Sequence, residues 1–73
     1  MWVIHVDKPE MVDDLVETLR GRCCTVERGD ENAVFASIPK SLSAEGSRRE
    51  LDLYLRAWEA QRPGARATRV GER

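Results

Sequence analysis

An apolar stripe at helical spacing in the first twenty residues constrains this 73-residue chain more than any other feature. Its members recur at i, i+1, i+4, i+5 and i+8, and charged side chains occupy the opposite side: Met11, Val12, Leu15, Val16 and Leu19. This spacing is typical of an amphipathic helix with one face against a core. The stripe therefore predicts a helix, which Gly21 is placed to end as a left-handed residue.

The segment before this stripe predicts a strand followed by a helix start. Residues 2–6 are aromatic or β-branched at four of five positions, as is typical of a strand. Asp7 can cap the first helical amides, Pro9 suits the first turn, and Glu10 would complete a capping box. We therefore expect a strand over 2–6 and a helix from about residue 10.

The middle of the chain predicts a β-hairpin. Residues 23–28 and 33–38 are two strand-like segments, and the turn-forming sequence Gly-Asp-Glu-Asn at 29–32 lies between them. Pro39 follows the second segment and cannot continue a strand.

The last third predicts a second helix and a final strand. Ser47 and Glu50 have the spacing of a capping box. A second apolar stripe follows at helical spacing: Leu51, Tyr54, Leu55 and Trp58. We expect this helix to run to about Gln61, before Pro63 and Gly64, and residues 65–70 to form a short strand.

The order of these elements predicts an α+β protein with the ferredoxin-like βαββαβ arrangement. In that arrangement a four-stranded antiparallel sheet has the strand order 4-1-3-2, and both helices cover one face. The charged strands 2 and 4 would then be the edges, where charge resists unwanted pairing. We expect one domain over residues 1–70 and a frayed tail over 71–73.

Alternation along the strands assigns their residues to two faces. The more apolar set is expected to face the helices: Trp2, Ile4, Val6, Cys24, Val26, Val34, Ala36 and Ile38. The other set is expected on the open face: Val3, His5, Cys23, Thr25, Glu27, Ala33, Phe35, Ser37 and Arg69. Because Val3, Ala33 and Phe35 are apolar, we expect this face to be the interface of a homodimer or a larger homo-oligomer. The interface is expected to be formed by Val3, His5, Cys23, Thr25, Ala33, Phe35 and Ser37.

His5 is the one candidate for acid–base catalysis, because imidazole titrates near neutral pH. Glu27, Ser37 and Arg69 are the open-face side chains that could orient it. The adjacent Cys23 and Cys24 would point to opposite faces of a strand, so they cannot hold one ion together. We therefore predict neither a metal site nor a cofactor.

Charge and composition argue against several classes of partner. A net charge of −1 and a single open-face aromatic, Phe35, are atypical of nucleic-acid binding. No apolar stretch reaches the length of a membrane span, and residues 1–7 resemble a strand more than a signal peptide. Two cysteines that cannot form a bridged scaffold predict a cytoplasmic location.

The first half of the chain resembles the opening of ACT domains. The resemblance rests on Val6-Asp7-Lys8-Pro9, the amphipathic helix, Gly21 and the next strand. ACT domains have the ferredoxin-like fold, pair with one another, and hold an amino acid or other small effector near the turn after strand 1. The resemblance thus implies an effector site at Asp7, Lys8, Pro9 and Glu10, although the family typically has Gly where this chain has Glu10.

Three functions follow from these patterns. We expect a small non-catalytic interaction module that self-associates through its open sheet face. The first alternative is an ACT-like regulatory domain that binds a small effector. The second is an enzyme similar to the dimeric α+β barrel proteins, with His5 as the acid or base.

Overall fold

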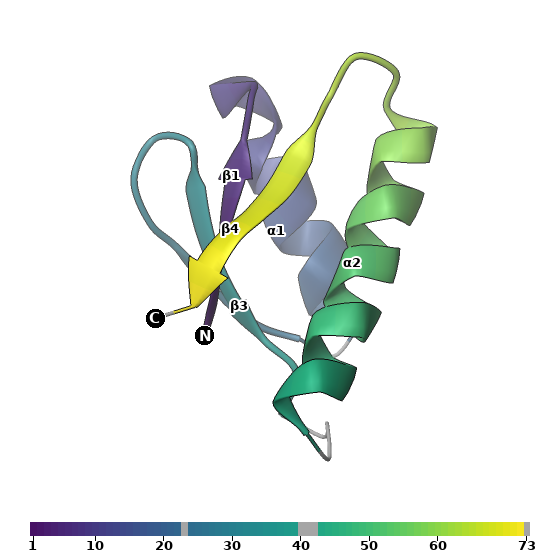
Figure 1. Cartoon of the computed structure of the whole chain (residues 1–73). Coiled ribbons are helices and arrows are strands. Elements are labelled where there is room, and N and C mark those ends of the chain that lie inside the picture. The colour runs from purple at the N-terminus through teal and green to yellow at the C-terminus, as the bar shows by residue number, and fades with distance from the viewer. Residues whose placement is uncertain (23, 40–42, 73) are drawn as a thin grey trace.

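The computed structural model describes residues 1–22, 24–39 and 43–72. The chain forms one antiparallel sheet and two α-helices (Figure 1). In chain order the elements are β1 (Trp2–Val6), the 3₁₀ turn η1 (Pro9–Met11), α1 (Val12–Arg20), β2 (Thr25–Arg28), β3 (Ala33–Ser37), α2 (Ala44–Gln61) and β4 (Ala67–Glu72). The predicted α+β class is confirmed.

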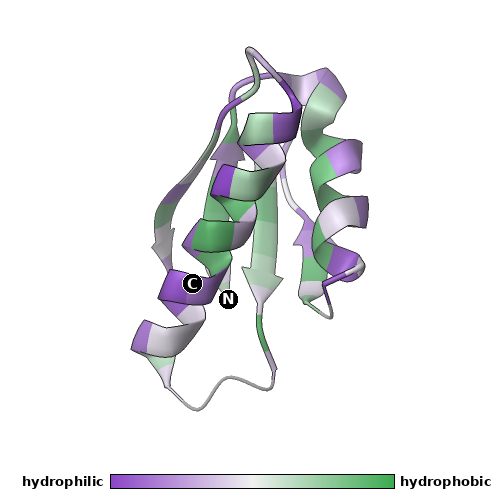
Figure 2. Cartoon of the chain, turned by 90° about the vertical axis from the view of Figure 1, so that its right-hand side faces the viewer, coloured by the Kyte–Doolittle hydropathy of each residue, from purple (hydrophilic) through white to green (hydrophobic). Residues whose placement is uncertain are grey.

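The sheet has the order β2-β3-β1-β4, which is the predicted order written from the other edge. All neighbouring strands are antiparallel, and β1 and β3 are central. Figure 2 looks onto the helix layer and shows α1 and α2 in front of the sheet. The predicted strand order, which rests on the succession of elements and on the rules for their connections, is therefore confirmed.

The core lies between the sheet and the two helices. Its residues from the first three strands are among those that alternation assigned to the inner face, and its helix residues come from the two apolar stripes. Ala65 and Ala67, at the start of the last strand region, also belong to the core, although the prediction did not assign them to the inner face. The largest fully buried side chains are Trp58, Ile4, Leu15, Leu19, Leu51, Val6, Val12 and Val34. Trp2 and Ile38 pack against this core while remaining partly exposed.

The start of the first helix differs from the prediction. Pro9 opens the short 3₁₀ turn as expected, but no side chain caps η1 or α1. The Asp7 carboxylate instead accepts a hydrogen bond from the Arg66 backbone N–H at 2.8 Å. The predicted capping box of Asp7 and Glu10 is therefore wrong, because a backbone donor 59 residues away takes the carboxylate.

Gly21 does not end α1 in the predicted left-handed conformation. Its φ of −65° and ψ of −16° are right-handed, and its N–H bonds to the Glu17 carbonyl at 3.0 Å. The helix simply tightens into its last turn, which a residue other than glycine could also do.

The second helix begins earlier than predicted. Ser43 is its N-cap and accepts a hydrogen bond from the Gly46 N–H at 3.0 Å. Ser47 is buried inside the helix and accepts a bond from the Trp2 indole Nε1 at 3.2 Å. The predicted Ser47–Glu50 capping box is therefore wrong, because Ser47 satisfies an indole from β1 instead of the helix amides.

Strand bounds shift at four places, one of them the start of β4, which begins at Ala67 and not at residue 65. β2 begins at Thr25, after the buried Cys24, and β3 ends at Ser37. β4 runs two residues beyond the predicted end, because Gly71 pairs with Val3 and Glu72 with Trp2. The described part of the expected tail is thus held in the sheet, and Arg73 lies outside the described residues.

Gly64, in the loop between α2 and β4, adopts a φ of +88°. An alanine there would carry the strain of a left-handed L-residue, and its Cβ would lie 3.2 Å from the Lys8 ammonium. We expect Gly64→Ala to lower the free energy of unfolding by about 1 kcal/mol in urea denaturation. Gly46→Ala, within α2, should raise it by about 0.5 kcal/mol, and equal signs for the two changes would contradict the argument.

Within the described residues, no helix combines the length and the apolar character needed to cross a membrane.

Candidate functional site

The open face of the sheet carries the predicted interface residues. Register pairs Val3 with Phe35 and His5 with Ala33 on the central strands, and Thr25 with Ser37 on β2 and β3. Four of the side chains are half-buried within the single chain, and two are exposed. The half-buried ones are Val3, Ala33, Phe35 and Ser37, and the exposed ones are His5 and Thr25; Cys23 lies outside the described residues.

Phe35 is shielded on one side by the hairpin turn. A Cβ added to Gly29 would lie 2.8 Å from the Phe35 Cε2 atom and 3.2 Å from the Ala33 Cβ. The ring therefore lies against the bare backbone of Gly29. Val3, Ala33 and Phe35 together form a small apolar patch on the central strands, which we call the central patch.

Arg69 was predicted on the open face and lies on the helix face instead. The β1–β4 register shifts between Val3 and Ile4, so that Ile4 faces Arg69 while Val3 faces Gly71. The extra residue of this irregularity is Val70, beyond Arg69, whereas Ala67, Thr68 and Arg69 alternate regularly against Val6, His5 and Ile4. Arg69 therefore shares the inner face of the buried Ile4 and Ala67, and the face that the prediction assigned to it was wrong. The Arg69 Nε then donates to Asp52 on α2 at 3.0 Å, and its guanidinium lies 5.3 Å from the centre of the Trp2 ring.

His5 is exposed on β1, and its neighbours do not form an acid–base constellation. Its cross-strand partners are Ala33 and Thr68. Glu27 is on β2, separated from β1 by the whole of β3, and Arg69 faces the opposite layer. Among the described residues, no carboxylate orients the imidazole as a general base requires.

The predicted effector turn is tied to the loop before β4. Asp7 binds Arg66 twice, through its carboxylate to the Arg66 N–H and through its own N–H to the Arg66 carbonyl at 3.0 Å. The Asp7 carboxylate is thus already hydrogen-bonded. Lys8, Pro9 and Glu10 are exposed, and the Lys8 ammonium reaches the backbone at Gly64.

Both outer strands have a backbone group engaged by a helix side chain. On β4 the Glu59 carboxylate of α2 accepts the Ala67 N–H at 2.9 Å. On β2 the Arg20 guanidinium of α1 lies 3.5 Å from the Val26 carbonyl oxygen. A backbone N–H or carbonyl group that is bound in this way is not available to pair with a strand of another chain.

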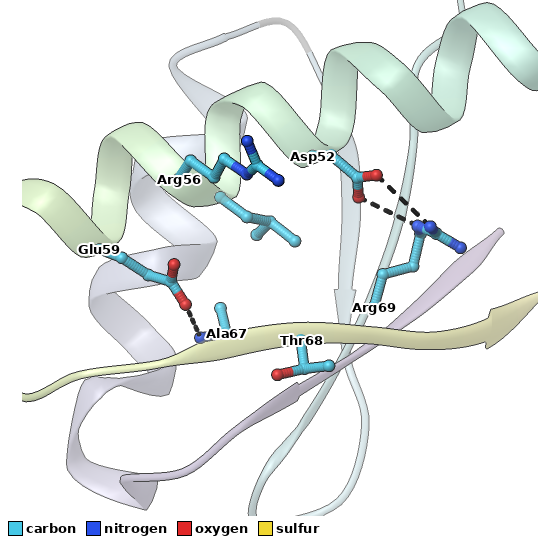
Figure 3. A pocket seen from close by; sticks show the side chains of 7 residues that line it. Asp52, Arg56, Glu59, Ala67, Thr68 and Arg69 are labelled. Carbon is cyan, nitrogen blue, oxygen red and sulfur yellow. Dashed lines mark hydrogen bonds and ion pairs between the residues drawn. The ribbon is translucent and has the colours of Figure 1, made fainter.

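A groove between α2 and β4 was missed by the sequence prediction. Figure 3 shows its walls, with Asp52 reaching Arg69 and Glu59 reaching the Ala67 backbone. The hollow drawn there has a volume of about 260 Å³, and its lining is Asp52, Leu55, Arg56, Glu59, Ala67, Thr68 and Arg69. Only the assembled fold brings these segments together, and the exposed Leu53 on the polar side of the helix is the one local indication of it.

Metal ligands do not gather in the part of the chain that the structure describes: no group of three or more His, Cys, Asp or Glu side chains could hold an ion there. No family model, curated protein or solved structure matches this chain.

Proposed function

We propose that this chain is a ferredoxin-like interaction module that forms a homodimer through its open sheet face and has no chemistry of its own. The observation that carries this proposal is the central patch of Val3, Ala33 and Phe35 on the one sheet face that no helix covers. In a two-fold dimer the same patch would meet itself, so apolar area on both copies would leave water together.

The edges of the sheet are less suited to self-association than its open face. Strand addition at β2 or β4 would compete with the Arg20–Val26 and Glu59–Ala67 contacts. Charged side chains also line these edges, and Arg28 of β2 pairs with Asp13 of α1. Packing through the face requires none of these interactions to break.

The size of the face predicts a weak dimer. Four strands spaced by about 4.8 Å and five residues long, at about 3.3 Å per residue, span roughly 320 Å² in projection. A standard interface buries about 800 Å² of accessible surface on each partner. We therefore expect a dissociation constant in the micromolar range, with fast exchange between monomer and dimer.

We expect sedimentation equilibrium at neutral pH, from about 1 to about 500 µM, to show a reversible monomer–dimer equilibrium. Phe35→Thr keeps β-propensity but removes the ring from the central patch, so it should weaken the dimer about tenfold or more. Val3→Thr, which is nearly isosteric, should weaken it in the same direction without disturbing the fold.

Leu53→Ser is the matched control, because Leu53 is 65% exposed on α2, away from the open face. It should leave the dissociation constant unchanged, and circular dichroism should show all three variants folded. A monomer at every concentration, or a dimer lost in Leu53→Ser and retained in Phe35→Thr, would refute the proposal.

A further inference from the structure

We propose that the groove between α2 and β4 binds an extended, acidic peptide segment of another protein, with an apolar side chain of that segment at Leu53. The groove lies at the edge of the sheet beside α2, whereas the dimer interface proposed above is the uncovered sheet face (Figures 1 and 3). The two surfaces are therefore separable by mutation.

Three adjoining hollows make up the groove. The hollow of about 260 Å³ beside Asp52 and Arg69 is flanked by one of about 310 Å³ at Leu53 and one of about 530 Å³ at Gly64. Arg56 lines all three. A row of open hollows that share lining residues fits an extended chain better than a compact ligand, which is normally enclosed in a single pocket.

The charges of the groove favour an anionic partner. Four arginines and two carboxylates line it, giving a formal charge of +2 on a protein whose net charge is −1: Arg49, Arg56, Arg66 and Arg69 with Asp52 and Glu59. Both carboxylates are engaged, Asp52 by the Arg69 side chain and Glu59 by the Ala67 backbone.

Only two of the four arginines of the groove form ion pairs within the described residues. Arg69 is held by Asp52, and Arg49 pairs with Glu45 in an exposed bridge of 3.2 Å. Arg56 and Arg66 make no ion pair within the described residues, although both are exposed at the groove. Two unpaired guanidinium groups, in a groove whose two carboxylates are already hydrogen-bonded, complement a segment with spaced Asp or Glu side chains.

Leu53 makes a peptide the better partner than a nucleic acid. It is 65% exposed and lines the groove between Arg49 and Arg56. An apolar anchor beside cations suits a peptide of mixed acidic and apolar residues. No aromatic ring lines any of the three hollows, so nothing there offers a base a stacking surface.

The test is fluorescence anisotropy of a fluorescein-labelled 12-residue peptide of aspartate and glutamate with two leucines, titrated with the full chain. We expect saturable binding at sub-millimolar concentration. The double change Arg56→Glu with Arg66→Glu should weaken it about tenfold or more, and Leu53→Ser about threefold. Arg48→Glu is the matched control, because Arg48 is exposed on the same helix and does not line the groove; it should have less than a twofold effect.

Several results would overturn the proposal. These are the absence of saturable binding, equal weakening by Arg48→Glu and by the groove variant, and equal binding of a lysine version of the peptide. Tighter binding of a labelled oligothymidine would assign the groove to nucleic acid instead. Phe35→Thr should leave peptide binding unchanged, so failure of the dimer proposal is measured separately.

Discussion

Replacing Trp58 with alanine is expected to remove about half of the stability of this protein. Trp58 is the largest fully buried side chain and is 1% exposed. Large aromatic-to-alanine changes in a core cost about 3–5 kcal/mol. Domains have about 0.05–0.15 kcal/mol of stability per residue, so a chain of this length has roughly 4–11 kcal/mol in total.

The cost is increased by what the indole binds. Its Nε1 donates to the Asp14 carboxylate of α1 at 3.0 Å, and the Arg62 guanidinium lies 5.4 Å from the ring centre. Trp58→Phe keeps a ring but deletes this donor, so we expect it to cost about 2 kcal/mol, less than alanine.

Urea denaturation followed by circular dichroism measures both changes. Leu53→Ala on the exposed side of the same helix is the control and should cost less than about 0.5 kcal/mol. The expectation fails if Trp58→Ala unfolds at nearly the urea concentration of the unmodified protein.

The second large effect is expected at Asp14, where the two helices are joined. Its carboxylate accepts bonds from the Trp58 indole and from the Arg62 guanidinium at 2.6 Å, and Thr18 also lies against it. The Arg62 and Trp58 hydrogen bonds hold the pKa of Asp14 below its usual value of 3.8. Since the Asp14 side chain is 40% exposed, we take the lower part of the range for bonds to charged groups and expect Asp14→Ala to cost about 1.5 kcal/mol at neutral pH.

This contribution has a defined pH dependence. Because the folded protein holds the Asp14 proton less tightly than the unfolded chain does, the stabilisation is fully present above the unfolded pKa of 3.8. It is lost as the pH falls from 3.8 through the lower folded value. The difference in unfolding free energy between the unmodified protein and Asp14→Asn should therefore be larger at about pH 6 than at about pH 3.

Asp13→Asn provides the comparison for the Asp14 variants. Asp13 is the neighbouring carboxylate, and its ion pair with Arg28 is far more exposed. Removing its charge should cost at most about 0.5 kcal/mol. An Asp14→Asn difference that does not change between the two pH values, or an equal effect of Asp13→Asn, would rule out the assigned role of Asp14.

The sequence by itself determined the elements and, for the two helices and the first three strands, their inner faces. The stripe from Met11 to Leu19 is apolar at a helical period, and Val34 and Ala36 alternate with partly exposed neighbours. Both periods depend on a few consecutive residues, so they can be recognised without knowing how the rest of the chain folds. The strand order followed because short connections and right-handed crossovers leave few arrangements for this succession of elements.

Only the tertiary structure decided which partners the polar side chains take. Asp7 and Ser47 have the spacing of local caps, yet Asp7 binds Arg66 and Ser47 binds Trp2, across 59 and 45 residues. Each polar group binds a donor that the fold brings close to it in space, and sequence spacing reports only the local candidates.

The same reason explains the face of Arg69 and the groove beside it. Alternation divides a strand into two faces but does not say which face is the inner one, and in β4 this follows from its alignment with β1, where Arg69 pairs with the buried Ile4. This register turns Arg69 toward Asp52, and the groove between α2 and β4 exists only once these two elements lie together. Local periodicity thus determined the layers, and contacts between distant segments determined the surfaces on which the proposed functions depend.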